Sequence, residues 1–332
     1  MAHNLNFKAS GQAAMVYQGE APWHRLGSVI PADRVRDRQF VMELAGMDWT
    51  VAKEPIYLTD NVIIPDRVAI VRQDTKAVLG LATDKIKVIQ NHEAFALFDR
   101  LLERGQIEIE TAGVLGAGER VWCLFKHSAA TAEPIKGDRV QGYLFAIFGH
   151  DAETSLQGMF TATRAVCENT VQIALGNKGR VFSIPHVGNV ARELALAERL
   201  LDTATAAMEK AGETFASMAR RAMSPAEVVS FIESVFPAAD DGSISTQLAT
   251  RRDHVAELMI SGRGADLAKS ETDGRPNAWS CLNAVTEYVD HVSTGTAAAG
   301  SATRRANQSA LFGSGNEFKL TALSKARELV AV

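Results

Sequence analysis

Long apolar runs are missing from this chain of 332 residues. No stretch approaches the roughly 18 apolar residues that a membrane-spanning helix requires. The first residues, Met1 to Lys8, also lack the apolar segment of a secretory signal. The sequence therefore predicts a cytoplasmic protein that does not contact a membrane.

Cysteine is scarce, and an excess of positive charge is absent. Cys123, Cys167 and Cys281 show no CxxC spacing, which argues against a disulfide framework and a cysteine-rich zinc site. The net charge of -4 and pI of about 6.1 argue against a protein that coats duplex DNA through bulk electrostatics. The acidic excess lies in residues 186–249, so both flanks are nearly neutral and able to carry a local basic groove.

What is present is apolar sequence in periodic segments, 46% of the chain, which is ample for a folded core. The pattern predicts an α+β fold with an N-terminal antiparallel β-meander, packed helices and a C-terminal helical region. We expect an α+β domain over residues 1–185 and a mainly helical region over 186–332, which is able to pack on the same core.

The first region carries strand and turn signals that alternate with three short helical patterns. Asn91 is the expected N-cap of the middle helix, and Gly46 is the expected end of the first. Helices are predicted over 33–45, 92–104 and 166–175, and strands over 49–58, 62–72, 77–89, 107–115, 120–126, 140–149 and 159–163.

The second region is predicted to be helical. An Ala-rich stretch over 189–221 has apolar residues at helical spacing. Ser224, followed by Pro225 and Glu227, is a capping box that opens a helix through Phe236. Further helices are expected over 245–260 and 278–292, and a mobile loop rich in Gly, Ala, Ser and Thr is expected over 294–315.

Residue types that could form a metal site or a cysteine nucleophile occur around His150. They are His150, Asp151, Glu153, Cys167, Glu168 and His186. Their spacing matches no metal-binding motif, and a histidine beside an aspartate is more often part of a capped turn. The sequence therefore predicts no catalytic residue, no metal and no cofactor.

Two Gly-rich turns, Gly262-Arg263-Gly264 and Gly313-Ser314-Gly315, could cradle a phosphate if each opened a helix. Neither continues into a P-loop or a dinucleotide-binding motif, so both are interpreted as plain turns. Arg263 is kept as a candidate phosphate contact.

Other basic and aromatic residues favour a nucleic-acid interface. Trp23, His24 and Arg25 share one loop. Either Trp23 is buried and anchors the N-terminal arm, or Trp23 or His24 stacks on a base while Arg25 neutralises a phosphate. Lys85 and Lys87 alternate along one predicted strand, and Arg120 and Lys126 flank a neighbouring hairpin. The remaining candidates are Arg164, Lys178 and Arg180. A sheet face lined in this way would follow a phosphate backbone.

The chain resembles a family of phage and plasmid-like proteins of unknown function, found in bacteriophages, plasmids and genomic islands. The resemblance covers nearly the whole length. It is carried by Met1-Ala2-His3, Pro22 to Gly27, Leu79-Gly80 with Val88 to Asn91, Arg164 to Thr170, and Asn283 to His291. Two departures are Glu168 in place of the family's glutamine and the lack of glycine-serine after Asp151. The resemblance implies a mobile-element context in a bacterial host, where recombination, single-strand annealing and counter-defence are common.

Three functional hypotheses remain. The first is a non-enzymatic protein that binds or anneals single-stranded DNA in recombination and acts as a homo-oligomer, with the phosphates in a basic groove. The second is a counter-defence or regulatory protein that binds a host protein through an exposed apolar or acidic surface on the Ala-rich helix or the mobile loop. The third and least favoured is a hydrolase that uses His150, Asp151 and Cys167.

Overall fold

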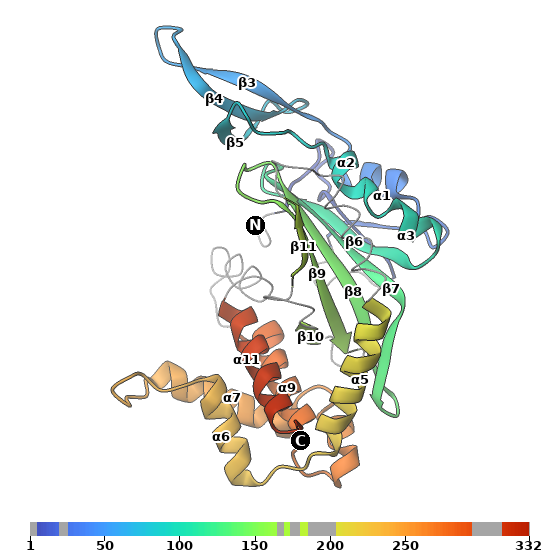
Figure 1. Ribbon diagram of the computed structural model, residues 1–332, viewed down its shortest axis with the longest axis vertical. Coiled ribbons are helices and arrows are strands. Elements are labelled where there is room, and N and C mark those ends of the chain that lie inside the picture. Colours follow the sequence, from blue (N-terminus) through green and yellow to red (C-terminus); the bar gives the residue numbers. More distant parts are fainter. Residues whose placement is uncertain are drawn as a thin grey trace.

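The computed structural model describes residues 5–19, 26–164, 169–172, 180–184, 204–293 and 314–331. Antiparallel sheets lie in the N-terminal half and helices dominate the C-terminal half, which confirms the predicted α+β class. A small three-stranded sheet occupies one end of the molecule, a large sheet its middle, and the C-terminal helices its other end (Figure 1).

The small sheet is the predicted meander. It consists of β3 (Val51–Tyr57), β4 (Ile63–Arg72) and β5 (Val78–Thr83), in the order β3-β4-β5. Helix α1 (Arg38–Ala45) precedes it and starts later than predicted, because the Asp37 carboxylate accepts the Phe40 N–H at 3.0 Å. The helix ends as predicted at Gly46, whose φ of 68° is in the left-handed region.

The helix predicted over 92–104 is divided into α2 (Asn91–Ala96) and α3 (Asp99–Glu103). Asn91 is not its N-cap, contrary to the prediction. The Asn91 side chain is buried and donates to the carbonyl of Met47 at 2.9 Å, whereas Gln90 takes the cap position and its N–H donates to Glu93 at 2.8 Å. A tertiary hydrogen bond has displaced the local cap by one residue.

The large sheet has the order β10-β9-β8-β7-β6-β1-β2, with β11 also paired to β9. Its strands are β1 (Met15–Tyr17), β2 (Ser28–Val29), β6 (Ile107–Leu115), β7 (Arg120–Ile135), β8 (Asp138–Gly149), β9 (Leu156–Arg164), β10 (Asn169–Gln172) and β11 (Arg180–Ile184). The predicted hairpin and the strands over 140–149 and 159–163 are confirmed. The helix predicted over 166–175 is wrong where the chain is described, because Asn169–Gln172 pairs with β9 as a strand.

The helical half follows the predicted order, and the strongest local prediction is confirmed. Ser224 caps α6, its hydroxyl accepting the N–H of Glu227 while Glu227 accepts the N–H of Ser224 at 2.8 Å. The helices are α5 (Ala204–Arg220), α6 (Pro225–Val235), α7 (Thr246–Ser261), α8 (Ala265–Ala268), a 3-10 turn η2 (Ser270–Thr272), α9 (Ala278–Glu287), a π-helical turn η3 (Tyr288–Val292) and α11 (Ser314–Glu328). Most of the loop predicted over 294–315 lies outside the described residues.

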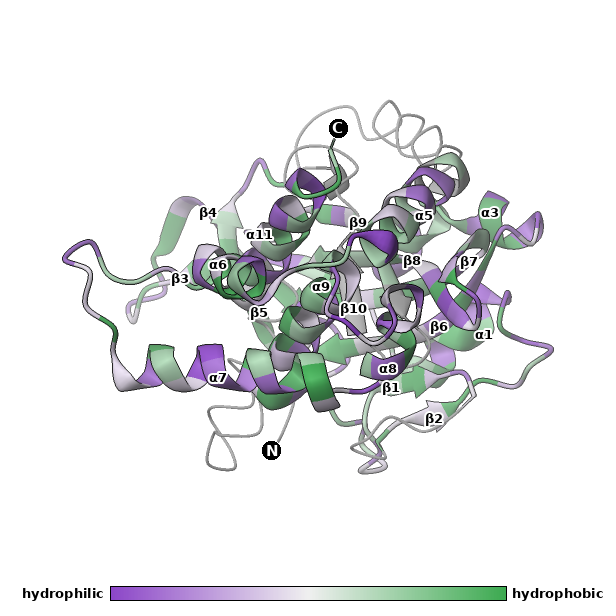
Figure 2. Ribbon diagram, turned by 90° about the horizontal axis from the view of Figure 1, so that it is seen from below, coloured by the Kyte–Doolittle hydropathy of each residue, from purple (hydrophilic) through white to green (hydrophobic). Residues whose placement is uncertain are grey.

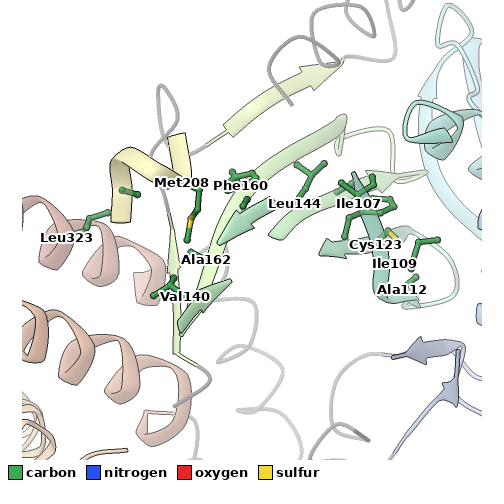
Figure 3. Packing of buried hydrophobic residues seen from close by; sticks show 14 of the residues in the cluster. Ile107, Ile109, Ala112, Cys123, Val140, Leu144, Phe160, Ala162, Met208 and Leu323 are labelled. Carbon is green, nitrogen blue, oxygen red and sulfur yellow. The ribbon is translucent and has the colours of Figure 1, made fainter. Parts of the chain in front are cut away.

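The main core lies against one face of the large sheet, which we call the first face. Strand residues such as Leu144 and Phe160 point into this core together with Met208 of α5 (Figure 3). Toward the small sheet, Phe98 packs on Phe125 of β7, with ring centroids 4.4 Å apart. Helix α9 lies in the middle of the helical half, surrounded by its neighbours (Figure 2), and all its residues are buried.

The two halves meet at a buried hydrogen bond. Trp279 of α9 donates its indole N–H to the carboxylate of Asp138, at the start of β8, at 2.9 Å. Both residues are fully buried, and Phe215 of α5 packs on the indole with ring centroids 4.8 Å apart. One hydrophobic cluster therefore contains residues of both the sheet and the helices.

Replacing this donor should destabilise the fold. In Trp279→Phe the Asp138 carboxylate loses the indole N–H in a place that water does not reach, so we expect a loss of about 1–3 kcal/mol in the free energy of unfolding. Urea denaturation followed by circular dichroism measures this loss. Trp122→Phe, the same change at a half-buried position, is the control and should cost less. Equal losses in the two variants would contradict a special role of the buried bond.

Candidate functional site

Strand β7 presents two different faces. Val121, Cys123 and Phe125 point into the main core. The intervening residues Arg120, Trp122, Leu124 and Lys126 are half-buried and project from the opposite side of the large sheet, because successive side chains of a strand alternate. We call this side the second face.

Neighbouring strands complete the second face. Tyr143 of β8 lies opposite Lys126, and Phe145 lies opposite Leu124 on β7 and Met159 on β9. The residues Phe145, Ile147 and Met159, with Trp122 and Leu124 packed against them, form an apolar cluster separate from the main core.

Trp122 is held in this cluster by two neighbours. Its indole stacks on the ring of Phe145, with centroids 6.2 Å apart and planes inclined by 21°. The Cζ2 and Nε1 atoms of the indole lie beside Gly113 of β6, where a Cβ atom would come within 3.2 Å of them. The absence of a side chain at Gly113 therefore lets the indole lie close to the backbone of β6.

Arg120, Trp122, Leu124 and Lys126 form a row along β7. A carboxylate partly neutralises the charge of Arg120, at one end of this row. The Nε atom of Arg120 lies 2.9 Å from Asp151, which follows β8. Asp151 also accepts hydrogen bonds from the backbone N–H of Thr154 at 2.7 Å and of Glu153 at 3.0 Å. Burial raises the pKa of Asp151, but the hydrogen bonds from Thr154, Arg120 and Glu153 outweigh it and leave the pKa below its usual value.

The other end of the row is a mixed charge cluster. Lys126 lies opposite Glu108 of β6 in the strand register. The Glu108 carboxylate forms an ion pair with the Arg36 guanidinium, with an N–O distance of 2.7 Å. Burial raises the pKa of nearby Glu110, an effect that Lys126 opposes. Burial also raises the pKa of Tyr143 to about 12, so its phenol is protonated at neutral pH and able to donate a hydrogen bond.

Two of the basic residues expected to line one groove, Lys85 and Lys87, are not arranged as predicted. Lys85 and Lys87 do not alternate along a strand, because β5 ends at Thr83 and the chain turns there. Both are exposed, with Ile86 buried between them. They follow the small sheet, whereas Arg120 and Lys126 belong to the large one.

The remaining candidates lie elsewhere. The backbones of Arg164 and Arg180 pair at the β9 edge of the large sheet, opposite Asn169 and Met159 respectively. Trp23, His24, Arg25 and Lys178 lie outside the described residues.

The Gly-rich turn at Arg263 already holds an anion from the chain itself. The backbone N–H of Arg263 donates to both carboxylate oxygens of Glu287, each at 3.0 Å. Glu287 is buried in α9, so this contact ties the turn to the centre of the helical half. An external phosphate at this amide would have to displace Glu287, whereas a phosphate contact by the Arg263 side chain stays a prediction.

The residues considered for hydrolysis have structural partners. His150 is buried, and its Nε2 atom lies 2.7 Å from Oδ1 of Asn91. Its ring packs edge-on against the ring of Phe148, with centroids 4.9 Å apart. Asp151 caps the turn before β9, as the alternative interpretation of the His-Asp pair predicted. Cys167, Glu168 and His186 lie outside the described residues.

The two cysteines that the structure describes, Cys123 and Cys281, are buried, and burial raises both thiol pKa values, that of Cys281 to about 12. Within the described part of the chain, no group of three or more His, Cys, Asp or Glu side chains is placed to hold a metal ion.

Two aromatic residues of the second face, Trp122 and Tyr143, were not among the predicted site residues. The signal was present in the strand pattern. Because Arg120 and Lys126 are an even number of residues apart, Trp122 and Leu124 between them must share their face. Tyr143 could not be added in this way, since only the register of β8 against β7 places it beside Lys126.

Comparison with known proteins gives one finding. A family model described as "Domain of unknown function (DUF932)" matches residues 78–312. Comparison with the curated proteins and with the solved structures returns no match. Among the described helices, none is long and apolar enough to cross a membrane.

The stability of the turn between β8 and β9, where Asp151 contacts Arg120, should depend on the ionised form of Asp151. Its pKa is lowered in the folded state, so the stabilisation is present above the unfolded pKa of about 4 and is lost as pH falls through the folded value. Asp151→Asn should therefore lower the free energy of unfolding by about 1–3 kcal/mol at pH 7. The difference in the free energy of unfolding between Asp151→Asn and wild type should become smaller below about pH 4.

Urea denaturation at a series of pH values checks this, with Asp60→Asn in the exposed β3–β4 turn as the control. A loss that stays constant down to the acid limit would show that the charge of Asp151 is not what stabilises the turn.

Proposed function

The chain belongs to the DUF932 family, a membership that assigns no activity, and we propose from the geometry of the large sheet that it binds single-stranded DNA. The interface is the second face, and the protein acts without catalysis, in strand annealing or recombination. The resemblance to phage and plasmid proteins supports a mobile-element setting for this activity.

One observation carries the proposal: the row Arg120, Trp122, Leu124 and Lys126 on one face of β7. Side chains on one face of a strand repeat about every 6.6 Å, so the row is about 20 Å long. It has a cation at each end and an indole between them. Proteins that bind single strands without sequence preference use this combination, with aromatic rings stacked on bases and cations near the phosphates.

An unpaired strand suits this surface better than a duplex. Unpaired bases offer their faces to Trp122, which a stacked duplex does not. Duplex binding rests mainly on the neutralisation of many phosphates, and a chain with a net charge of -4 offers little bulk attraction. The lysines after β5 and Arg263 are not needed for this interface.

The carboxylates beside the row set the strength of binding. A phosphate at Arg120 competes with Asp151, and a phosphate at Lys126 competes with Glu108, although Arg36 shares the charge of Glu108. We therefore expect a small number of phosphate contacts and a shallow dependence on salt, with stacking as the larger contribution to affinity.

Removing the indole should weaken binding. Stacking is worth about 1–3 kcal/mol per base, so Trp122→Ala should raise the Kd for a fluorescent oligothymidine by roughly five- to 150-fold. Fluorescence anisotropy at low salt measures this change, and a thermal melt checks that the variant is folded. Tyr57→Ala, which removes an exposed aromatic residue from the small sheet, should bind like wild type. An unchanged Kd for Trp122→Ala, or no binding by wild type, would overturn the proposal.

Lys126 should contribute through its charge. Each phosphate contact adds about 0.7 to the slope of log K against log salt for single strands, so Lys126→Gln should reduce the slope by about that amount. The measurement is the same titration repeated across a salt series. Lys136→Gln, in the exposed turn between β7 and β8, should leave the slope unchanged. A slope equal to that of wild type in Lys126→Gln would remove this residue from the interface.

A second candidate function, binding of a host protein, is favoured by the tip of the β3–β4 hairpin. Tyr57, Leu58, Val62 and Ile63 are each more than half exposed there. This apolar tip lies on the small sheet, whereas the sequence favoured the Ala-rich helix or the loop over 294–315 for such a surface. Binding through the tip does not involve an oligonucleotide, so the wild-type titration distinguishes the two functions.

A further inference from the structure

Three sulfur atoms meet in the core of the helical half. The Sγ atom of Cys281 lies 3.5 Å from Sδ of Met223 and 3.8 Å from Sδ of Met259. Cys281 belongs to α9 and Met259 to α7, whereas Met223 lies in the connection between α5 and α6. Cys281 is 0% exposed, Met259 2% and Met223 4%. We call these three residues the sulfur trio.

Apolar packing alone does not account for the arrangement of the sulfur trio. Cysteine and methionine fill gaps in cores by their volume, and this role does not require their sulfur atoms to meet. A thiol carries one proton, so Cys281 donates to one thioether at a time. Three soft donor atoms therefore converge from three segments of the chain, and one of the two contacts has no proton between its sulfur atoms.

The spacing of the sulfur atoms suits a three-coordinate metal ion. A metal ion bonded to three sulfur atoms in one plane at about 2.3 Å holds those atoms about 4.0 Å from one another. The two separations from Cys281, 3.5 Å and 3.8 Å, are slightly shorter than this value. A methionine side chain is unbranched and has three rotatable bonds, so small outward shifts of the two thioethers admit the ion.

The charge of the sulfur trio favours a monovalent ion. Thiolate and thioether ligands are soft and select Cu(I). One thiolate, two neutral thioethers and Cu(I) have no net charge, whereas Zn(II) in the same place leaves one positive charge in an apolar core, where it is costly. Burial raises the pKa of the Cys281 thiol, because a thiolate alone has no counter-charge there. Cu(I) supplies that charge as the thiol proton leaves to solvent.

We propose that Cys281, Met223 and Met259 together bind one Cu(I) ion. The ion links α7, α9 and the connection after α5, so it stabilises the helical half against unfolding. Met223 lies on a connection and not in a helix, and movement of this connection lets the ion enter. The sulfur trio is separate from the second face of the large sheet, so its test is made without nucleic acid and its failure would not affect the proposed function.

Replacement of the thioethers tests the site at nearly constant volume. The full chain is titrated under anaerobic conditions against a chromogenic Cu(I) chelator, and native mass spectrometry counts the bound ions. Wild type should bind one ion per chain, and Met223→Leu and Met259→Leu should each raise the Kd by at least about tenfold. Met208→Leu is the matched control, because Met208 is fully buried and packs toward the large sheet (Figure 3). It should bind like wild type.

The thiol and the metal have tests of their own. The double variant Cys123→Ala, Cys167→Ala keeps Cys281 as its single cysteine and should still bind one ion, whereas Cys281→Ala should not. Cu(I) should raise the Tm of wild type, and Zn(II) should not. Circular dichroism checks that each variant is folded.

Four results would overturn the Cu(I) site. They are the absence of stoichiometric uptake by wild type, an unchanged Kd in both Met223→Leu and Met259→Leu, loss of binding in the double cysteine variant, and an equal rise in Tm with Zn(II). The first three would leave the sulfur trio as plain core packing, and the fourth would reject the assignment of a monovalent ion.

Discussion

The two-residue alternation of β7 is the constraint from which the core and the candidate interface both follow. Val121, Cys123 and Phe125 fill the main core, so the residues between them are excluded from it. A shift of one residue in the register would bury Arg120 and Lys126 and expose Phe125. The pairing of β7 with β6 and β8 is thus fixed by the apolar side, and the row on the second face is placed as a consequence.

Electrostatics on the second face supports local contacts and little long-range attraction. Arg120 and Lys126 each lie near a carboxylate, and the whole chain is acidic. A surface of this kind does not draw polyanions from a distance, and its affinity must come from close contact. In the proposed interface Trp122 is the residue suited to supply that contact, since a stacked ring loses little conformational freedom on binding.

Local signals predicted the elements whose stabilising contacts are local. The capping box at Ser224 and the left-handed Gly46 both occur where the sequence placed them. Predictions were wrong where a distant partner decides the conformation. Asn91 is drawn away from its cap by Met47, and residues 169–172 extend because β9 offers them an edge. No local pattern contains either partner.

The candidate site was partly predictable for the same reason. Arg120 and Lys126 were identified because they flank a predicted hairpin. Alternation along their strand is a local property, and it also reaches Trp122. The alternation of Lys85 and Lys87 along a strand was wrong, because β5 ends at Thr83. Their grouping with Arg120 and Lys126 required the position of the small sheet relative to the large one. That position depends on close contacts such as Gly80 against the turn at Asp151.

Two of the motifs that carry the family resemblance, both among the described residues, contribute contacts that build the fold. Asn91 joins Met47 and His150, and in the motif from Asn283 to His291 the Glu287 carboxylate holds the turn at Arg263. In the same motif Asp290 pairs with buried Lys319 of α11. Buried polar groups of this kind are costly to leave without partners, so their residue types are restricted by the fold itself. A motif restricted in this way identifies a family without indicating an activity.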